Sequence, residues 1–192
     1  MFILASASPR RRDLLRQIGA RFAAVASGAE ESLREAPPRD AVVHNALAKA
    51  EAVAAAYPEH AVLGADTAVV IAGNVFGKPK NPADARHIIE LLAGRRHEVC
   101  TGVAWIYRGR AYTDVAVTAV QFAPMSAAEI ARYIATGEPM GKAGGYAIQG
   151  RAAMYIEEIH GSYSNVVGLP LQAVAALARE AGISLFEDDA AP

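Results

Sequence analysis

The stretch from Ala61 to Ile71, AVLGADTAVVI, restricts the fold more than any other part of the chain. It is a nearly continuous apolar run that only Gly64 and Asp66 interrupt among otherwise apolar or small residues. A run of this length without regular polar alternation is typical of a strand that is buried on both faces. It therefore predicts a central strand in the interior of a sheet.

Strand and helix patterns alternate along the rest of the chain. Ser126, with Glu129 three residues later, forms a capping box that marks one helix start. Two β-rich segments flank a turn at Arg108–Arg110 and predict a hairpin. Together the patterns predict an α/β fold, with a mixed sheet flanked by helices. The predicted strands cover 1–6, 22–27, 61–71, 99–107, 112–122 and 152–159, and the predicted helices cover 9–19, 39–57, 82–92, 126–137 and 169–181.

Composition excludes several classes of protein. The 192 residues fit one domain or two closely fused lobes, and the formal net charge of −1 gives no footprint for a nucleic acid polymer. No segment has the ~20 apolar residues that cross a bilayer, so no membrane association is expected. Cys100, the single cysteine, and the lack of a signal peptide favour a cytoplasmic protein. The acidic end, about 186–192, is expected to be a solvated tail.

The first strand leads into a helix start that suits an anion. Ser8 is the expected N-cap and Pro9 the first helical residue, so free backbone N–H groups face the end of the strand. Ser6, Arg10 and Arg11 surround this point, and an arginine fork binds phosphate oxygens in pairs. The pattern favours a phosphate site over an ordinary solvated basic face.

Asp66 is the polar exception within the central strand. A buried aspartate needs a partner, which can be a metal ion, a lysine or a hydrogen-bond network. Asp66 can hold a divalent cation or activate water as a general base, whereas a structural hydrogen bond is the alternative. Thr67 points to the opposite face if the strand is regular, so its presence at the site requires the strand to end or bend here.

The segment Gly137–Gly150, GEPMGKAGGYAIQG, lacks helical or strand periodicity and contains five glycines. Such density suits backbone that bends sharply or approaches a ligand closely, and a flexible hinge is the alternative. Lys142 can bind phosphate, and Gln149 can read a base edge. Lys78, held between Gly77 and Pro79, and Lys49 are further candidate cations. Glu30 and Glu31 can complete a carboxylate metal site with Asp66, although each of these residues alone is also compatible with a solvated side chain.

Several common catalytic patterns are missing from the sequence. It contains no HExxH pair for zinc, no GxSxG elbow and no GxxxxGK[ST] phosphate loop. Seven other motifs do occur: LASASPRRRDLL, AEES, LAKA, GADTAVV, GKP, GYAIQG and GSYSNVVGLPL. Their order resembles that of the Maf family of nucleoside triphosphate pyrophosphatases, and the resemblance covers residues 3 to about 177.

This resemblance implies a two-lobed fold similar to inosine triphosphatases, formed by one domain over 1–192, with the substrate in the cleft between the lobes. It implies hydrolysis of a nucleoside triphosphate to the monophosphate and pyrophosphate, dependent on Mg²⁺ or Mn²⁺. It assigns the general base to Asp66 and the metal to Glu31 and Asp66. Specificity falls on Arg10, Thr67 and Gln149, and the other phosphate-site residues are Ser6, Arg11, Lys49 and Lys78. A homodimer is expected from the resemblance alone.

Arg, Thr and Gln at the three specificity positions are similar to the branch of the family that acts on dTTP and UTP. We therefore expect a house-cleaning enzyme for these nucleotides, including modified pyrimidine nucleotides. A pyrophosphatase acting on 7-methyl-GTP or non-standard purines is one alternative. A nucleotide-sensing regulator of cell division or septum formation is another, and slow turnover with tight triphosphate binding would distinguish it.

Overall fold

The centre of the molecule is one mixed sheet. The computed structural model describes residues 1–33 and 36–186, so most of the expected acidic tail lies outside the described residues. The strand order is β2-β1-β3-β5-β6-β7, and β4 pairs with β3. β1 runs parallel to β2 and β3, and the other pairs are antiparallel. The strands are β1 (Phe2–Leu4), β2 (Phe22–Ala24), β3 (Val62–Ile71), β4 (Asn74–Phe76), β5 (Arg96–Tyr107), β6 (Arg110–Phe122) and β7 (Ile156–His160).

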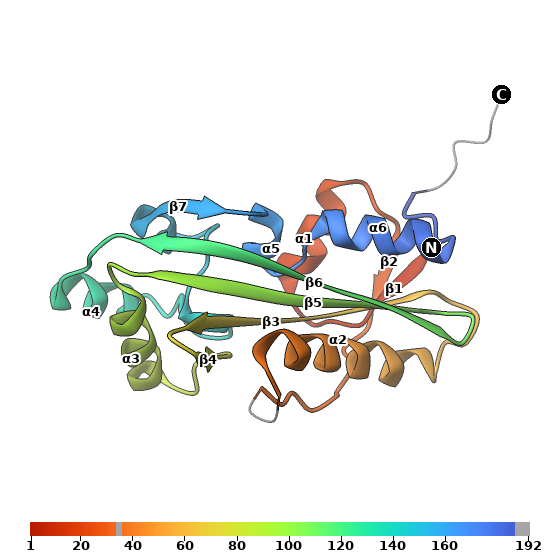
Figure 1. Ribbon diagram of the computed structural model, residues 1–192, viewed down its shortest axis with the longest axis horizontal. Coiled ribbons are helices and arrows are strands. Elements are labelled where there is room, and N and C mark those ends of the chain that lie inside the picture. Colours follow the sequence, from red (N-terminus) through yellow and green to blue (C-terminus); the bar gives the residue numbers. More distant parts are fainter. Residues whose placement is uncertain (34–35, 187–192) are drawn as a thin grey trace.

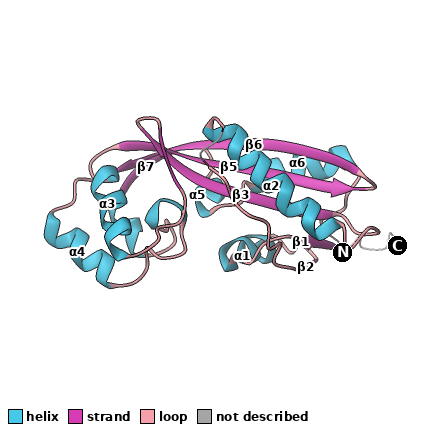
Figure 2. Cartoon of the chain, turned by 90° about the horizontal axis from the view of Figure 1, so that it is seen from below, coloured by secondary structure: helices cyan, strands magenta, loops and turns pink. Residues whose placement is uncertain are grey.

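Helices cover both faces of this sheet, which confirms the predicted α/β class. One face carries α2, while α1, α5 and α6 lie on the other, and α3 and α4 gather at one end (Figure 1). Figure 2 shows α2 lying across the long strands β3 and β5. The helices are α1 (Pro9–Gln17), α2 (Pro38–Ala54), α3 (Pro82–Leu92), α4 (Ala127–Ala135), α5 (Tyr163–Val167) and α6 (Leu171–Ala181), with 3₁₀ turns η1 (Ala143–Gly145) and η2 (Arg151–Tyr155).

Two glycines allow α2 to lie directly against the sheet. A Cβ atom added to Gly64 on β3 would fall 2.1 Å from the carbonyl oxygen of Ala46. One added to Gly102 on β5 would fall 2.3 Å from the carbonyl oxygen of Val42. Neither distance is sterically possible, so this approach of helix and sheet requires glycine at both positions. The close contact brings the inner face of α2 over the middle of β3.

Two large apolar clusters lie toward opposite ends of the sheet. One joins Phe2 and Trp105 to α1 and α6, and the Trp105 indole donates a hydrogen bond to the carbonyl of Val174 at 3.1 Å. The other joins Phe122 and Tyr133 to α3 and α4. Because the long strands pass through both clusters, the middle of the sheet is held between two packed ends.

The predicted elements with strong boundary signals are confirmed. The capping box of α4 is complete, since the Ser126 hydroxyl accepts from the Glu129 backbone and Glu129 accepts from the Ser126 backbone. The hairpin at Arg108–Arg110 joins β5 to β6 as expected. Ser8 is the N-cap residue of α1 and Pro9 its first residue, as predicted, although the Ser8 side chain makes no capping hydrogen bond.

The predicted strand over 152–159 was wrong at its start. Residues 151–155 form η2, and β7 begins only at Ile156. The physical reason lies in the backbone N–H groups of Arg151 and Ala152, which donate to the Glu138 carboxylate instead of to a neighbouring strand. The sequence interpretation also missed the short elements β4 and α5.

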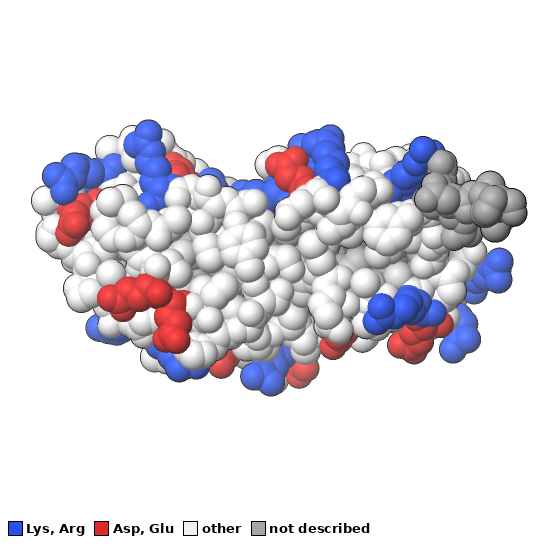
Figure 3. Space-filling view, turned by 90° about the horizontal axis from the view of Figure 1, so that it is seen from above, with Lys and Arg blue, Asp and Glu red and all other residues white. Residues whose placement is uncertain are grey.

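The distribution of charged side chains on the surface agrees with the small net charge of the chain. On the face shown in Figure 3, most of the surface is uncharged, and basic and acidic side chains lie mainly around its rim. None of the helices in the described ranges is both long enough and apolar enough to cross a membrane.

A candidate active site at the open edge of the central strand

The site lies where the central strand lacks a neighbour. β5 pairs with one edge of β3 from Val62 to Val70. On the other edge, β1 pairs with β3 at 62–63 and β4 pairs with it at 69–71. Within residues 1–33 and 36–186, the intervening positions 64–68 therefore have no strand partner on that edge. A cavity of about 440 Å³ opens at this gap.

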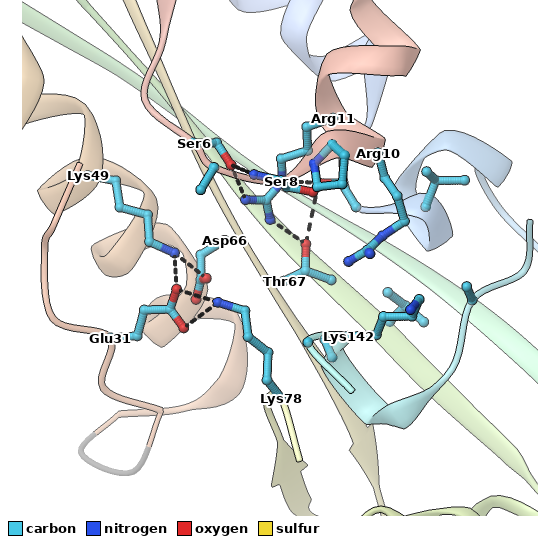
Figure 4. Close-up of a pocket in the computed structure, with 18 of the residues that line it drawn as sticks. Ser6, Ser8, Arg10, Arg11, Glu31, Lys49, Asp66, Thr67, Lys78 and Lys142 are labelled. Atoms are coloured by element: carbon cyan, nitrogen blue, oxygen red, sulfur yellow. Dashed lines mark hydrogen bonds and ion pairs between the residues drawn. The ribbon is translucent and has the colours of Figure 1, made fainter. Parts of the chain in front are cut away.

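One side of the cavity is a cluster of lysines and carboxylates (Figure 4). Lys49 of α2 donates to Asp66 Oδ1 at 2.6 Å and to Glu31 Oε1 at 2.7 Å. Lys78 also donates to Glu31 Oε1, at 3.0 Å. Asn45, one helical turn before Lys49, donates to Asp66 Oδ2 at 2.8 Å. Both oxygens of the buried Asp66 carboxylate are thus hydrogen-bonded, and its charge is compensated by one lysine.

The lysines also set the charge state of Glu31. Burial alone would raise the pKa of this carboxyl, but hydrogen bonds and charge from Lys49, followed by those from Lys78, outweigh burial and hold the pKa at about 2. Glu31 is therefore ionised throughout the neutral range. The cluster presents two negative oxygen ligands beside two ammonium groups.

Arg11 hydrogen-bonds to several residues that line the cavity. Its guanidinium donates to the carbonyl of Gly168 at 2.7 Å, to Ser6 Oγ at 3.2 Å and to the carbonyl of Ala65 at 2.9 Å. It also donates to Thr67 Oγ1 at 3.0 Å. Burial is the main cause that lowers the pKa of Arg11, with opposing contributions from the two site carboxylates. Most of the donors of this arginine, which the sequence assigned to phosphate, are directed to the protein itself.

Thr67 lines the cavity without the end or bend in the strand that the sequence analysis had required. β3 continues without interruption to Ile71, and Asp66 and Thr67 oppose Gly102 and Thr101 in an unbroken register. Their side chains therefore point to opposite faces of the sheet. Both line the same cavity because its lining includes Lys49 on one side of the sheet and Arg11 and Gly168 on the other, around the open edge of β3.

A second pair of cations lies across the cavity from Glu31. Figure 4 shows Arg10 and Lys142 on the side opposite the Lys49 cluster. Burial lowers the pKa of Arg10, and burial followed by the charge of Arg10 lowers that of Lys142. The Lys142 ammonium donates to the backbone carbonyl of Glu138. An anion bound between these two basic groups would offset both their burial and their mutual repulsion.

The glycine-rich segment forms the remaining wall through Tyr146 and Gln149. The Tyr146 hydroxyl lies 2.8 Å from Nε2 of His97 on β5, in a buried hydrogen bond. Its ring packs edge-on against Phe122, at a centroid distance of 4.8 Å. No residue in the described part of the chain hydrogen-bonds to the side-chain amide of Gln149. The segment is thus anchored to the sheet, with the amide of Gln149 available to a ligand.

Burial of His97 makes the stability of the fold depend on pH. Burial lowers the pKa of His97 from 6.5 to about 4, so at pH 5 the unfolded chain binds a proton there that the folded chain does not. The free energy of unfolding should therefore be about 2 kcal/mol lower at pH 5 than at pH 7 because of this residue. Urea unfolding at both pH values measures the difference. His97→Gln should remove it, whereas His87→Gln, at an exposed position, should retain it; equal pH dependence in wild type and His97→Gln would contradict the assignment.

The structure brings every candidate residue of the sequence analysis except Glu30 to the cavity. Sequence reasoning missed Asn45, Tyr146 and Gly168. Asn45 had a usable signal, because it lies four residues before Lys49 and hence on the same helix face. The residues that line the cavity as expected are Ser6, Ser8, Arg10, Arg11, Glu31, Lys49, Asp66, Thr67, Lys78, Lys142 and Gln149.

The carboxylates are compatible with a divalent cation that is shared with a ligand. No group of three or more His, Cys, Asp or Glu side chains suited to a metal occurs among residues 1–33 and 36–186. Mg²⁺, however, is commonly held by only one or two carboxylates together with substrate phosphates. Asp66 and Glu31 supply such a pair of hard oxygen ligands at the cavity wall.

One protein family and several relatives that share a name match most of this chain. A family model described as "Maf-like protein" matches residues 1–181. A protein of Syntrophus aciditrophicus named "dTTP/UTP pyrophosphatase" is 47% identical, over 97% of this chain and 93% of its own length. Proteins of the same name from Symbiobacterium thermophilum and Anaeromyxobacter dehalogenans are 47% and 49% identical, over 96% and 95% of this chain and 95% of their own lengths. The solved structure of the Staphylococcus aureus Ham1 protein matches 63% of this chain and 71% of its own, at 13% identity and a TM-score of 0.46.

Proposed function

The chain belongs to the Maf family, and from this membership and its cavity we propose that it hydrolyses dTTP and UTP to the monophosphate and pyrophosphate. Its biological role would be to remove unwanted pyrimidine nucleotides, modified ones included, from the nucleotide pool. The observation that carries the proposal is the Asp66–Lys49–Glu31–Lys78 cluster, which faces further cations across one cavity.

The charge of the cavity suits a triphosphate. Five basic side chains and two carboxylates line it, so it is positive overall. A triphosphate carries several negative charges, which cations must balance as charge develops during displacement at phosphorus. Arg10 and Lys142 on one side and Lys49 and Lys78 on the other supply these cations. Arg11 contributes charge while it holds Ser6 and Thr67 in place.

We assign the role of general base to Asp66, a buried carboxylate in the cavity wall. In the proposed reaction, its carboxylate takes a proton from water while the water oxygen bonds to the α-phosphorus. The bond from that phosphorus to the oxygen bridging to the β-phosphorus breaks, and pyrophosphate leaves with the electron pair. Lys49 and Asn45 hold the two carboxylate oxygens, and this fixes the orientation of the base.

A divalent cation, Mg²⁺ or Mn²⁺, would be held by Glu31 and Asp66 together with phosphate oxygens. Both metals accept oxygen ligands of this kind. When bound, the cation would neutralise charge on the phosphates.

The nucleobase of the substrate would be recognised on the face of the sheet to which Thr67 points. Gln149 offers an amide with a donor and an acceptor, which matches the O4 and N3–H edge of uracil or thymine. Thr67 and Arg10 complete the specificity set. A base that left these groups unpaired would lose about 1–3 kcal/mol per buried group, which is enough to discriminate between nucleotides.

Product analysis tests the proposal directly. Purified protein with Mg²⁺ should convert dTTP and UTP to monophosphate and pyrophosphate, with kcat/KM at least about tenfold above that for CTP or GTP. Chromatography of the nucleotides and separate assays for pyrophosphate and orthophosphate distinguish the outcomes. Release of orthophosphate would contradict the mechanism, and a preference for purines would contradict the base assignment.

We infer a cytoplasmic enzyme, since its nucleotide substrates are metabolites of that compartment and its cysteine is free and buried. We treat residues 1–192 as one domain of two lobes around the cavity, with a homodimer expected from family resemblance.

A further inference from the structure

The segment Gly137–Gly150 has little regular structure with which to hold its shape. It links α4 to η2 and contains only the three-residue turn η1. It nevertheless carries Lys142 and Gln149 to the cavity wall. No strand pairing or long helix fixes this backbone. Turn hydrogen bonds and one bond from the Gly144 N–H to the Gly77 carbonyl, at 3.0 Å, hold part of it, and side-chain contacts hold its ends.

Glu138 joins the beginning of this segment to its end. Its Oε2 accepts from the backbone N–H of Arg151 at 2.8 Å, and its Oε1 accepts from that of Ala152 at 3.2 Å. Oε1 also accepts from the hydroxyl of Tyr133 at 3.1 Å, and Tyr133 belongs to α4. One carboxylate thus connects the helix before the segment with the turn after it. Hydrogen bonds from N–H groups to an ionised acceptor are stronger than those between neutral groups.

Gly150 makes room for this carboxylate. A Cβ atom at Gly150 would lie 2.6 Å from both carboxylate oxygens of Glu138. The φ angle of Gly150 is −114°, so the residue is required here by space and not by its backbone conformation. Glu138 and Gly150 therefore form a matched pair, and Gln149 is the residue immediately before the point where they meet.

We propose that Glu138 is a positioning residue for base recognition: by clamping the backbone beyond Gly150, it fixes the direction of the Gln149 amide. This inference depends on the proposed function, because it concerns how that function selects its base. Glu138 is absent from the cavity lining, so it acts through the segment and does not contact the substrate. Figure 4 shows Asp66 and the Lys49 cluster on the side of the cavity opposite Lys142, so we expect the proposed general base to keep its place when the clamp is lost.

Glu138→Gln tests the clamp, meaning the hydrogen bonds of Glu138 to Arg151 and Ala152, with a side chain of nearly the same shape. An amide in place of the carboxylate has one acceptor oxygen where two N–H groups and a hydroxyl need acceptors. The ratio of kcat/KM for UTP to that for CTP should fall about tenfold, while kcat at saturating UTP should remain within about twofold of wild type. Gly150→Ala should produce the same loss of selectivity with the Glu138 charge intact, because the added methyl group displaces the carboxylate.

Three reference proteins make the result decisive. Wild type must hydrolyse UTP, and its failure to do so would overturn the proposed function and, with it, the inference. Gln149→Ala shows the selectivity that remains without the base-reading amide. Glu129→Gln changes a carboxylate in the capping box of α4, away from the segment, and should leave selectivity unchanged.

Thermal unfolding of each variant separates positioning from stability. A folded Glu138→Gln protein whose UTP-to-CTP ratio equals that of wild type would overturn the proposal. An equal loss for every nucleotide would also overturn it, since this is the result of a purely structural role. If Glu138→Gln does not fold, the same two criteria apply to Gly150→Ala, where the carboxylate is retained.

Discussion

Replacement of Asp66 with Asn is expected to lower kcat for UTP hydrolysis by about 10³-fold. The substitution preserves size and shape at a buried position but removes the ability to take a proton from water. Lys49 still bonds to Glu31 at 2.7 Å, so the lysine retains one of its two partners. UTP should therefore still bind to a folded protein. The measurements are single-turnover hydrolysis with Mg²⁺, together with nucleotide binding by titration calorimetry.

The matched control for this variant is Asp114→Asn. Asp114 is an exposed carboxylate on β6 outside the cavity, and the same chemical change there should leave kcat unchanged. Wild-type turnover by Asp66→Asn would eliminate Asp66 as the base. A loss of binding as large as the loss of turnover would instead show that Asp66 mainly holds the nucleotide or its metal ion.

Replacement of Gly64 with Ala is expected to lower the free energy of unfolding by about 3 kcal/mol or to prevent folding. The added methyl group would lie 2.1 Å from the Ala46 carbonyl oxygen and 2.9 Å from the Ala50 nitrogen, both in the backbone of α2. Backbone cannot rotate away as a side chain can, so the whole helix must move. That movement would also carry Lys49 and Asn45 away from Asp66. Urea unfolding monitored by circular dichroism measures the loss.

Gly77→Ala is the control for this second variant. A methyl group at Gly77 meets only a terminal carbon of the Leu33 side chain, at 3.1 Å, and that side chain can turn aside. Its unfolding free energy should stay within about 0.5 kcal/mol of wild type. If Gly64→Ala were equally stable, the close approach of α2 to β3 would not be a requirement of the fold.

The sequence was sufficient to find the elements that carry strong local signals. The apolar run of β3, the capping box at Ser126 and the turn at Arg108–Arg110 each result from nearby residues, and each is confirmed. β4 was missed because the turn before it uses Ala72 at a φ of 48°, where a non-glycine residue is uncommon. The start of β7 was misplaced because Glu138, more than ten residues away, binds the backbone that would have formed a strand.

The sequence predicted which residues form the site better than it predicted what each of them contacts. Asp66 stood out as a charge within an apolar strand, and the helix start after Ser8 and the glycine-rich segment indicated further candidates. Family resemblance then assigned their roles. The sequence could not show that most donors of Arg11 bind protein oxygens, since an arginine beside a helix start suits a phosphate equally well. Nor could it show that Thr67 reaches the cavity from the opposite face, because this depends on where β1 and β4 stop pairing with β3.

The placement of Asp66 and Thr67 on successive positions of β3 limits how this protein can change during evolution. Side chains alternate along a strand, so insertion or deletion of one residue before this pair would exchange the faces to which the two side chains point. Both the reacting centre and the base-reading face would be lost in one event. Apart from Gly64, Asp66 and Thr67, positions of β3 can accept single substitutions, but its length between Gly64 and Thr67 cannot vary. The segment Gly137–Gly150 has no strand register to preserve, and changes of length are therefore expected to accumulate there among relatives that differ in their preferred base.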